Sequence, residues 1–224
     1  HRFGGRLDVQ TKRRMRAQLQ AFEADVALNW MSRAARFCPS GAWTNAARLG
    51  GYYSLKYYQQ CQAFVGNTEG ICDYLRKQGV PGARVHYIPN FIDERPLTAD
   101  DATEFPATKR EDAPVLLAAG RLHRNKGFDV LIEALSAVPS ATLWLAGDGP
   151  EQVNLAHLAE RLGVRDRIEF LGWQDDLRPY FQRADVFVCS SRIEPLGNIV
   201  LEAWRHGCPL VAARAAGPVE LIND

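Results

Sequence analysis

The stretch from Cys189 to Ala213 reads C-S-S-R-I-E-P-L-G-N-I-V-L-E-A-W-R-H-G-C-P-L-V-A-A. Its pattern predicts an apolar strand over 186–189, a polar loop, a helix over 197–206 and a second strand over 210–213. The unpaired N–H groups and the positive dipole end at the start of such a helix favour a phosphate. The stretch therefore predicts an anion site at the end of a strand.

Two glutamates flank the predicted helix start at Leu196-Gly197-Asn198, and seven residues separate them. Glu194 precedes the helix, and Glu202 lies about two turns into it. Gly197 allows a ligand to approach the backbone closely. A carboxylate repels phosphate but accepts hydrogen bonds from sugar hydroxyls, so the pattern indicates a ligand that carries both groups. The alternatives are an exposed helix glutamate at 202 and a carboxylate stabilised by the helix dipole at 194.

Strands alternate with helices along the rest of the chain, which predicts an α/β fold with parallel β-α-β units. An acidic, polar segment over 93–112 separates two domains, predicted at 1–105 and 106–224. The predicted strands outside the opening stretch are 25–28, 45–49, 63–65, 85–88, 115–119, 142–146 and 168–171. The predicted helices are 8–22, 68–78, 128–137, 151–162 and 176–183.

The Cys189–Ala213 stretch resembles the signature of the family-4 retaining glycosyltransferases, which have the GT-B fold. That signature has a glutamate before P-F-G, a second glutamate eight positions on, and then A-x-x-x-G-x-P-V-V. The matching residues are Glu194, Pro195, Leu196, Gly197, Glu202, Ala203, Gly207 and Pro209. The resemblance covers residues 111–224 and is weaker over 79–93. It implies two Rossmann-like domains that face each other across a cleft, and a chain that lacks both ends of the family's fold.

Two cations, Arg121 and Lys126, follow the predicted strand 115–119 and can grip a pyrophosphate, although a solvated basic turn has the same pattern. The resemblance implies that both bind the donor diphosphate and stabilise it as it leaves. It further implies catalytic roles for Glu194, Arg121 and Lys126. The residues implied to bind the donor are Arg121, Lys126, Gly172, Trp173, Glu194, Leu196, Gly197, Asn198 and Glu202.

Within that set, Glu194 contacts the donor sugar, Glu202 binds the ribose hydroxyls, and Gly172 and Trp173 lie near the base, according to the resemblance. A structural role for Trp173 is the alternative. Gly50 and Gly51 are placed on the acceptor side, and we expect the tyrosines that follow them to line that side: Tyr52, Tyr53, Tyr57 and Tyr58. Many relatives have a histidine where this chain has Gly50. A retaining mechanism needs no such base, because the leaving phosphate takes the proton, and we expect neither a metal nor another cofactor.

Charge is distributed unevenly. Residues 1–92 hold 13 Lys and Arg against 5 Asp and Glu, a balance of +8, whereas residues 93–224 hold 14 against 21, a balance of −7. Four cations of the first half, Lys12, Arg13, Arg14 and Arg16, surround Met15 in a predicted helix. We expect contact with an anionic membrane surface, the alternative being a solvated helix face. Five scattered cysteines without a C-x-x-C pair favour a reducing, cytoplasmic location.

The sequence thus predicts a metal-independent, retaining hexosyltransferase that moves a sugar from a nucleoside diphosphate sugar to a hydroxyl acceptor. By resemblance the acceptor is a saccharide or glycolipid of bacterial lipopolysaccharide, capsule or glycolipid synthesis, handled at the inner membrane face. No nucleic-acid partner is predicted. Two alternatives remain: a nucleotide-sugar-binding protein without turnover, and a GT-B relative with other chemistry, such as an epimerase.

Overall fold

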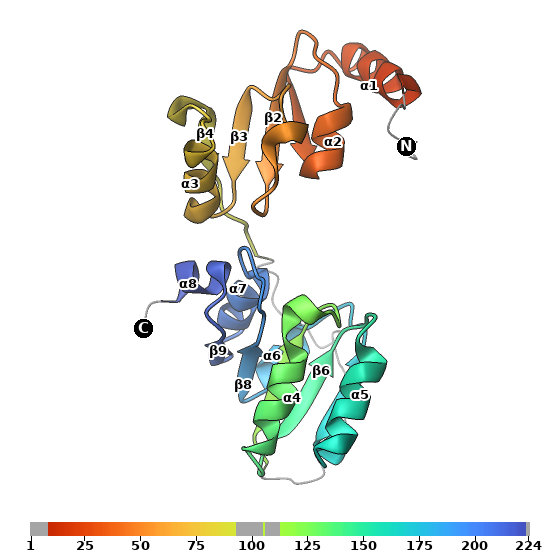
Figure 1. The fold of residues 1–224 in the computed structure, drawn as a ribbon, viewed down its shortest axis with the longest axis vertical. Helices are drawn as coiled ribbons and strands as arrows, with labels where there is room; N and C mark the ends of the chain where they lie inside the picture. The colour runs from red at the N-terminus through yellow and green to blue at the C-terminus, as the bar shows by residue number, and fades with distance from the viewer. Residues whose placement is uncertain (1–8, 93–104, 106–112, 223–224) are drawn as a thin grey trace. The chain divides into compact units, whose positions relative to one another are not determined.

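The computed structural model describes residues 9–92, 105 and 113–222, and the chain divides into two compact units, 1–90 and 91–224. Each unit contains one parallel sheet and is described by itself (Figure 1). Most of the predicted linker over 93–112 lies outside the described residues. Phe105 stacks on Trp144 of the second unit, with ring centroids 5.7 Å apart. The domain boundary at 105/106 stays a prediction.

The first unit holds four parallel strands in the order β1 (Val26–Trp30), β2 (Thr44–Leu49), β3 (Ala63–Gly66) and β4 (Val85–Tyr87). The helices of this unit are α1 (Val9–Ala21), α2 (Met31–Phe37) and α3 (Glu69–Lys77). Thr68 caps α3 by accepting a hydrogen bond from the Ile71 N–H, 3.1 Å away, as its position predicts. Ile71 and Leu75 of α3 pack with Leu49 and Phe64 of the sheet in the main core of the unit.

The second unit holds five parallel strands in the order β7-β6-β5-β8-β9. Their bounds are β5 (Val115–Ala119), β6 (Thr142–Ala146), β7 (Ile168–Gly172), β8 (Val186–Cys189) and β9 (Leu210–Ala212). In chain order this is 3-2-1-4-5, so the direction of winding reverses between β5 and β8. Ligands of doubly wound sheets bind outside the carboxyl ends of the strands at such a reversal. The topology therefore predicts a ligand site at the loops that follow β5 and β8.

Helices cover both faces of this second sheet. The helices are α4 (Phe128–Ser136), α5 (Gln152–Arg161), α6 (Arg178–Arg183), α7 (Asn198–Arg205) and α8 (Ala216–Leu221). Ile132 of α4 and Leu155 of α5 share one buried cluster, whereas Phe181 of α6 and Val200 of α7 belong to the other. Strand β5 contributes Leu117 to one cluster and Ala118 to the other, because successive side chains point to opposite faces. The α/β prediction is confirmed.

Two helices were missed by sequence analysis. Helix α2 begins directly after β1 at Met31, whose φ of 66° is unusual for a residue other than glycine, and Trp30 provides no side-chain cap. No start signal was therefore present in the sequence. Helix α8 contains Gly217 and Pro218, which favour a loop in sequence analysis, but proline is tolerated in the first turn of a helix.

Gly147 allows the loops after β5 and β6 to meet, and we expect its substitution to destabilise the second unit strongly. Its φ is 129°, and a Cβ there would lie 2.0 Å from the carbonyl oxygen of Gly120. Gly147→Ala adds backbone strain to this clash, so we expect a loss of about 3 kcal/mol or more in unfolding free energy. Hydrogen exchange of the β5 and β6 amides measures it.

Gly163→Ala is the matched control, because Gly163 also has a positive φ, 68°, but a Cβ there would meet nothing within 4 Å. We expect this control to lose about 1 kcal/mol from backbone strain alone. Equal losses of unfolding free energy in the two variants would show that the close approach between the loops does not determine stability.

Candidate functional site

The loop after β5 carries both predicted phosphate-binding cations. A 3-10 turn, Arg124–Lys126, precedes Gly127, which has a φ of 64° and starts α4. Arg121 is exposed and makes no hydrogen bond or ion pair to a described residue. Its guanidinium is therefore available to an anion at the carboxyl edge of the sheet.

The loop after β8 rests on this turn. The Ser190 hydroxyl donates to the Lys126 carbonyl at 2.9 Å, and the Arg192 N–H donates to the Asn125 carbonyl at 2.8 Å. The two loops also touch at Gly127, where a Cβ would lie 2.2 Å from the Ser190 carbonyl oxygen.

Arg192 strengthens the contact between the loops. Its guanidinium donates to both carboxylate oxygens of Asp129 in α4, at 2.6 and 2.8 Å, and to the Arg124 carbonyl at 3.0 Å. The hydrogen bond from Arg192 keeps the pKa of the Asp129 carboxyl below its usual value. This pair fixes the loop after β8 to the first turn of α4.

The predicted residues Lys126 and Glu194 meet, although 68 positions separate them. Lys126 Nζ lies 2.5 Å from Glu194 Oε2, and the Ser191 hydroxyl donates to the same oxygen at 3.2 Å. The side chains of Lys126 and Glu194 are 26% and 13% exposed, so the ion pair is partly shielded from water. Sequence analysis did not identify Ser191, which is 4% exposed.

The start of α7 lies on the same loop, as predicted. Gly197 occupies the N-cap position with a φ of 85° and offers no side-chain cap to the helix. Leu196 is buried, and a Cβ on Gly217 would lie 2.3 Å from its carbonyl oxygen. Asn198, the first residue of the helix, is exposed. A helix start without a side-chain cap suits an anion.

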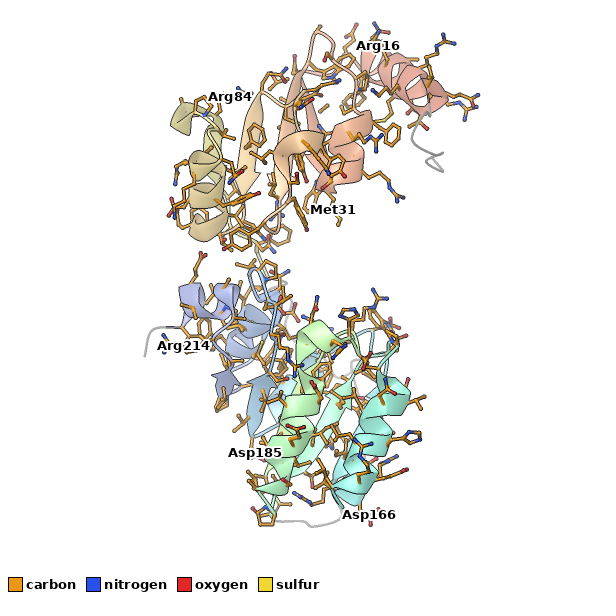
Figure 2. All side chains as sticks on the ribbon, in the orientation of Figure 1. Arg16, Met31, Arg84, Asp166, Asp185 and Arg214 are labelled. Carbon is orange, nitrogen blue, oxygen red and sulfur yellow. The ribbon has the colours of Figure 1, made fainter. Side chains whose placement is uncertain are left out.

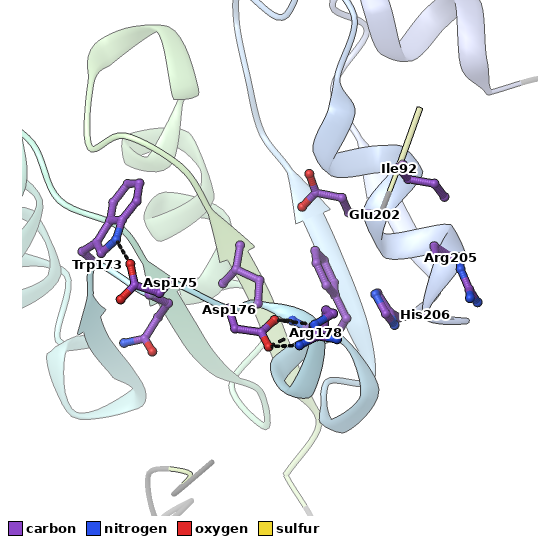
Figure 3. A pocket seen from close by; sticks show the side chains of 11 residues that line it. Ile92, Trp173, Asp175, Asp176, Arg178, Glu202, Arg205 and His206 are labelled. Atoms are coloured by element: carbon purple, nitrogen blue, oxygen red, sulfur yellow. Dashed lines mark hydrogen bonds and ion pairs between the residues drawn. The ribbon is translucent and has the colours of Figure 1, made fainter. Parts of the chain in front are cut away.

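Glu202 and Trp173, two predicted donor-binding residues, line one pocket of about 440 Å³ (Figure 3). The Trp173 side chain is 68% exposed, and its indole N–H donates to Asp175 Oδ1 at 2.8 Å. Arg178 donates to both oxygens of Asp176, the closest contact being 2.7 Å. In Figure 3 the carboxylate of Glu202 points from α7 toward the side where Trp173 lies, whereas Arg205 points away.

Burial raises the pKa of the Glu202 carboxyl above its ordinary value. No hydrogen bond or ion pair joins the side-chain carboxylate of Glu202 to any residue that the structure describes. His206 lines the same pocket and stacks on Phe181, and burial lowers the pKa of its imidazole. A shielded carboxylate that has no partner among the described residues is suited to accept hydrogen bonds from ligand hydroxyls.

The predicted acceptor-side residues belong to the first unit. Gly50 and Gly51 directly follow β2, so they lie at the carboxyl edge of its sheet, Gly50 half-buried and Gly51 buried. Tyr58, expected to line the acceptor site, is instead a core residue that packs with Leu49. Tyr52 is exposed. The structure therefore corrects the prediction for Tyr58.

Among residues 9–92, 105 and 113–222, no group of three or more His, Cys, Asp and Glu side chains has the geometry of a metal site. The loop after β5 supplies two cations, Arg121 and Lys126, whose charge suits an anion.

Residues 113–224 match the family model described as Glycosyl transferases group 1. The chain belongs to this family. It is 41% identical over 203 residues to the lipopolysaccharide core biosynthesis glycosyltransferase LpsE of Rhizobium meliloti, and 40% identical over 211 residues to LpsD of the same strain. These alignments cover 89% and 92% of this chain but 58% and 60% of the two relatives. The chain thus spans about three fifths of their length.

Solved structures share the fold. The crystal structure of Anabaena Alr3699/HepE in complex with UDP gives a TM-score of 0.79 at 23% identity, covering 94% of this chain and 65% of that protein. A glycosyltransferase from Rickettsia africae gives a TM-score of 0.80 at 15% identity, covering 100% and 67%. The predicted GT-B class is confirmed by these neighbours and by the two parallel sheets.

The raised pKa of Glu202 predicts a pH-dependent stability. A carboxyl with a raised folded-state pKa contributes stability that is present below its unfolded pKa and is lost as pH rises through the folded pKa. Glu202→Gln removes this titration. We therefore expect the melting temperature of the variant, relative to the original protein, to increase from pH 4 to pH 8.

Both proteins contain His206, so its titration cancels to first order in this comparison. Glu160→Gln, at an exposed position of α5, is the matched control for the amide substitution. The prediction fails if the melting temperatures of Glu202→Gln and the original protein differ by the same amount at pH 4 and pH 8. That result would show that burial does not disfavour the carboxylate.

Proposed function

We propose that this chain forms the donor-binding core of a retaining glycosyltransferase that transfers a sugar from a nucleoside diphosphate sugar to a hydroxyl acceptor. One observation carries the proposal. At the winding reversal between β5 and β8, the structure brings together Lys126, Glu194 and the uncapped start of α7. Cations and a helix start suit a diphosphate, and the carboxylate suits sugar hydroxyls.

The donor extends across this edge in the proposed complex. Arg121, Lys126 and the N–H groups at Gly197 and Asn198 hold the diphosphate. Glu202 accepts hydrogen bonds from the ribose hydroxyls in its pocket, because its carboxylate has no described protein partner. Trp173 packs on the base beside Gly172, which ends β7. Glu194 accepts hydrogen bonds from the sugar.

In the proposed reaction the bond between the anomeric carbon and the diphosphate oxygen breaks, and the acceptor oxygen forms its bond on the same face of the sugar. The acceptor proton passes to a phosphate oxygen of the leaving group. The reaction therefore needs no basic side chain at position 50, where this chain has glycine. Arg121, Lys126 and the α7 dipole stabilise the charge that develops on the diphosphate. We propose that these groups act without a divalent metal.

The names of the relatives guide the choice of substrates. LpsE and LpsD are described as enzymes of lipopolysaccharide core biosynthesis, and the Anabaena structure contains UDP. We propose a saccharide or glycolipid acceptor on the side of Gly50 and Gly51, and UDP as the first nucleotide to test.

Titration of UDP into the chain in the presence of EDTA tests the donor site. We expect saturable binding that is weakened about 10- to 100-fold by Glu202→Ala, since hydrogen bonds to charged groups contribute about 1.5–3 kcal/mol. Arg121→Ala should weaken binding to a similar degree, because it removes a charge-assisted contact to phosphate. Calorimetry measures both effects.

Glu160→Ala provides the control, since Glu160 is exposed on α5, outside the proposed site. A panel of other nucleoside diphosphates and nucleotide sugars follows if UDP does not bind. Lack of binding across the panel, or binding that requires Mn²⁺, would contradict the proposed site.

We further propose that α1 contacts an anionic membrane surface on the cytoplasmic side. Lys12, Arg13 and Arg14 are exposed and have no hydrogen bond or ion pair to described residues. Arg16 is exposed too and donates to the Ser40 carbonyl at 3.4 Å (Figure 2). No described helix combines the length and apolar character needed to cross a bilayer. Each cation near anionic lipid contributes about 1 kcal/mol to binding at the membrane surface.

The membrane proposal predicts that the chain sediments with vesicles of anionic phospholipid and not with vesicles of neutral phospholipid. Replacing Lys12, Arg13, Arg14 and Arg16 with Gln should abolish sedimentation without changing UDP affinity. Arg161→Gln together with Arg183→Gln, two exposed cations of the second unit, is the control. Equal sedimentation of the original protein and the fourfold variant would show that α1 is a solvated face.

A further inference from the structure

One carboxylate oxygen of Glu194 has two partners. Lys126 Nζ lies 2.5 Å from Oε2, and Ser191 Oγ lies 3.2 Å from the same atom. No contact from the other oxygen, Oε1, to a described residue is present. The carboxylate is therefore oriented by a lysine and a serine while one oxygen remains available to a ligand.

The two partners differ in how firmly the fold holds them. Ser191 is 4% exposed and belongs to the loop that Ser190 and Arg192 tie to the neighbouring turn. Its hydroxyl is therefore fixed. The Lys126 side chain is 26% exposed, and its ammonium sits at the end of a flexible stem, so it can turn toward a ligand.

A diphosphate that binds at Lys126 competes with Glu194 for the same ammonium. The approaching anion also repels the carboxylate, since like charges a few ångströms apart repel strongly in a partly shielded site. Without a second partner the Glu194 side chain would rotate away toward solvent. Ser191 supplies that partner, because a hydroxyl donates to a carboxylate irrespective of the lysine.

We propose that the donor diphosphate takes Lys126 from Glu194, and that Ser191 is the positioning residue that then keeps the Glu194 carboxylate directed at the sugar. This inference rests on the proposed function, since it requires that the diphosphate and the sugar bind at this site. The Lys126–Glu194 ion pair is thus the resting state of the empty site, and nucleotide binding exchanges one anion for another at Lys126.

The exchange predicts that Glu194 weakens the binding of ligands that carry a diphosphate but no sugar. Glu194→Gln removes the competitor for Lys126, so inorganic pyrophosphate and UDP should each bind about 5-fold more tightly, the scale of a partly exposed ion pair. Calorimetric titration of both ligands measures the change. Unchanged or weaker binding of both would overturn the exchange.

Ser191→Ala separates positioning from a general structural role. We expect UDP affinity to stay within about twofold, whereas affinity for the nucleotide sugar that binds best in the panel falls about 5-fold, the scale of one hydrogen bond. Ser191→Thr keeps a hydroxyl and should restore much of the loss. Ser136→Ala, which removes an exposed hydroxyl at the end of α4, is the control and should change neither affinity.

The outcomes distinguish this inference from the function on which it rests. Loss of UDP and sugar-nucleotide affinity by the same factor in Ser191→Ala would overturn the positioning role. If Ser191→Ala fails to fold, the pyrophosphate titration of Glu194→Gln decides alone. Binding of UDP that Glu202→Ala weakens, without tightening in Glu194→Gln, would overturn the exchange and leave the donor site supported. Lack of nucleotide binding by the original chain would overturn both.

Discussion

The close contact between the loops after β5 and β8 is the constraint on which the proposed donor site depends. Gly127 and the Ser190 carbonyl approach so closely that a Cβ at 127 would lie 2.2 Å from the oxygen. The hydrogen bonds from Ser190 and Arg192 act across the same contact. Because β5 and β8 are adjacent in the sheet, their carboxyl ends deliver these loops to one place. Lys126 and Glu194 meet for this reason, 68 positions apart.

The site also combines two kinds of carboxylate. Glu194 is paired with a lysine and a serine, so its charge is compensated and its direction is set. The carboxylate of Glu202 has no described partner, and burial raises its pKa. Both carboxylates suit hydroxyls more than phosphate, but the free energy gained when a ligand hydroxyl binds differs between them. Ligand hydroxyls relieve an existing cost at Glu202, whereas at Glu194 they replace part of an existing interaction.

Much of the fold followed from the sequence because the strands of the second unit are short apolar runs punctuated by glycine. The strand predicted at 142–146 matches β6, and the helix predicted at 128–137 differs from α4 by one residue. Helix α2 was missed because Trp30 and Met31 give no start signal. The residues of the site were named from motifs, but their contacts could not be. Arg192 acts through Asp129, 63 positions away, and no local pattern specifies that pairing. Ser191 lies only three positions from Glu194, but its hydrogen bond depends on how the loop folds between them.

The net negative charge of the second half opposes an anionic donor, but the strength of this effect depends on distance. Residues 93–224 carry a balance of −7, yet Arg121 and Lys126 lie on the loop nearest the winding reversal. At physiological ionic strength, exposed charges more than about 8 Å apart are largely screened. The local cations and the α7 dipole then determine the potential at the site, and the acids elsewhere act weakly on it. The cations of α1 are subject to the same screening, so the net charge of a domain predicts its partners less well than the few charges that a ligand meets directly.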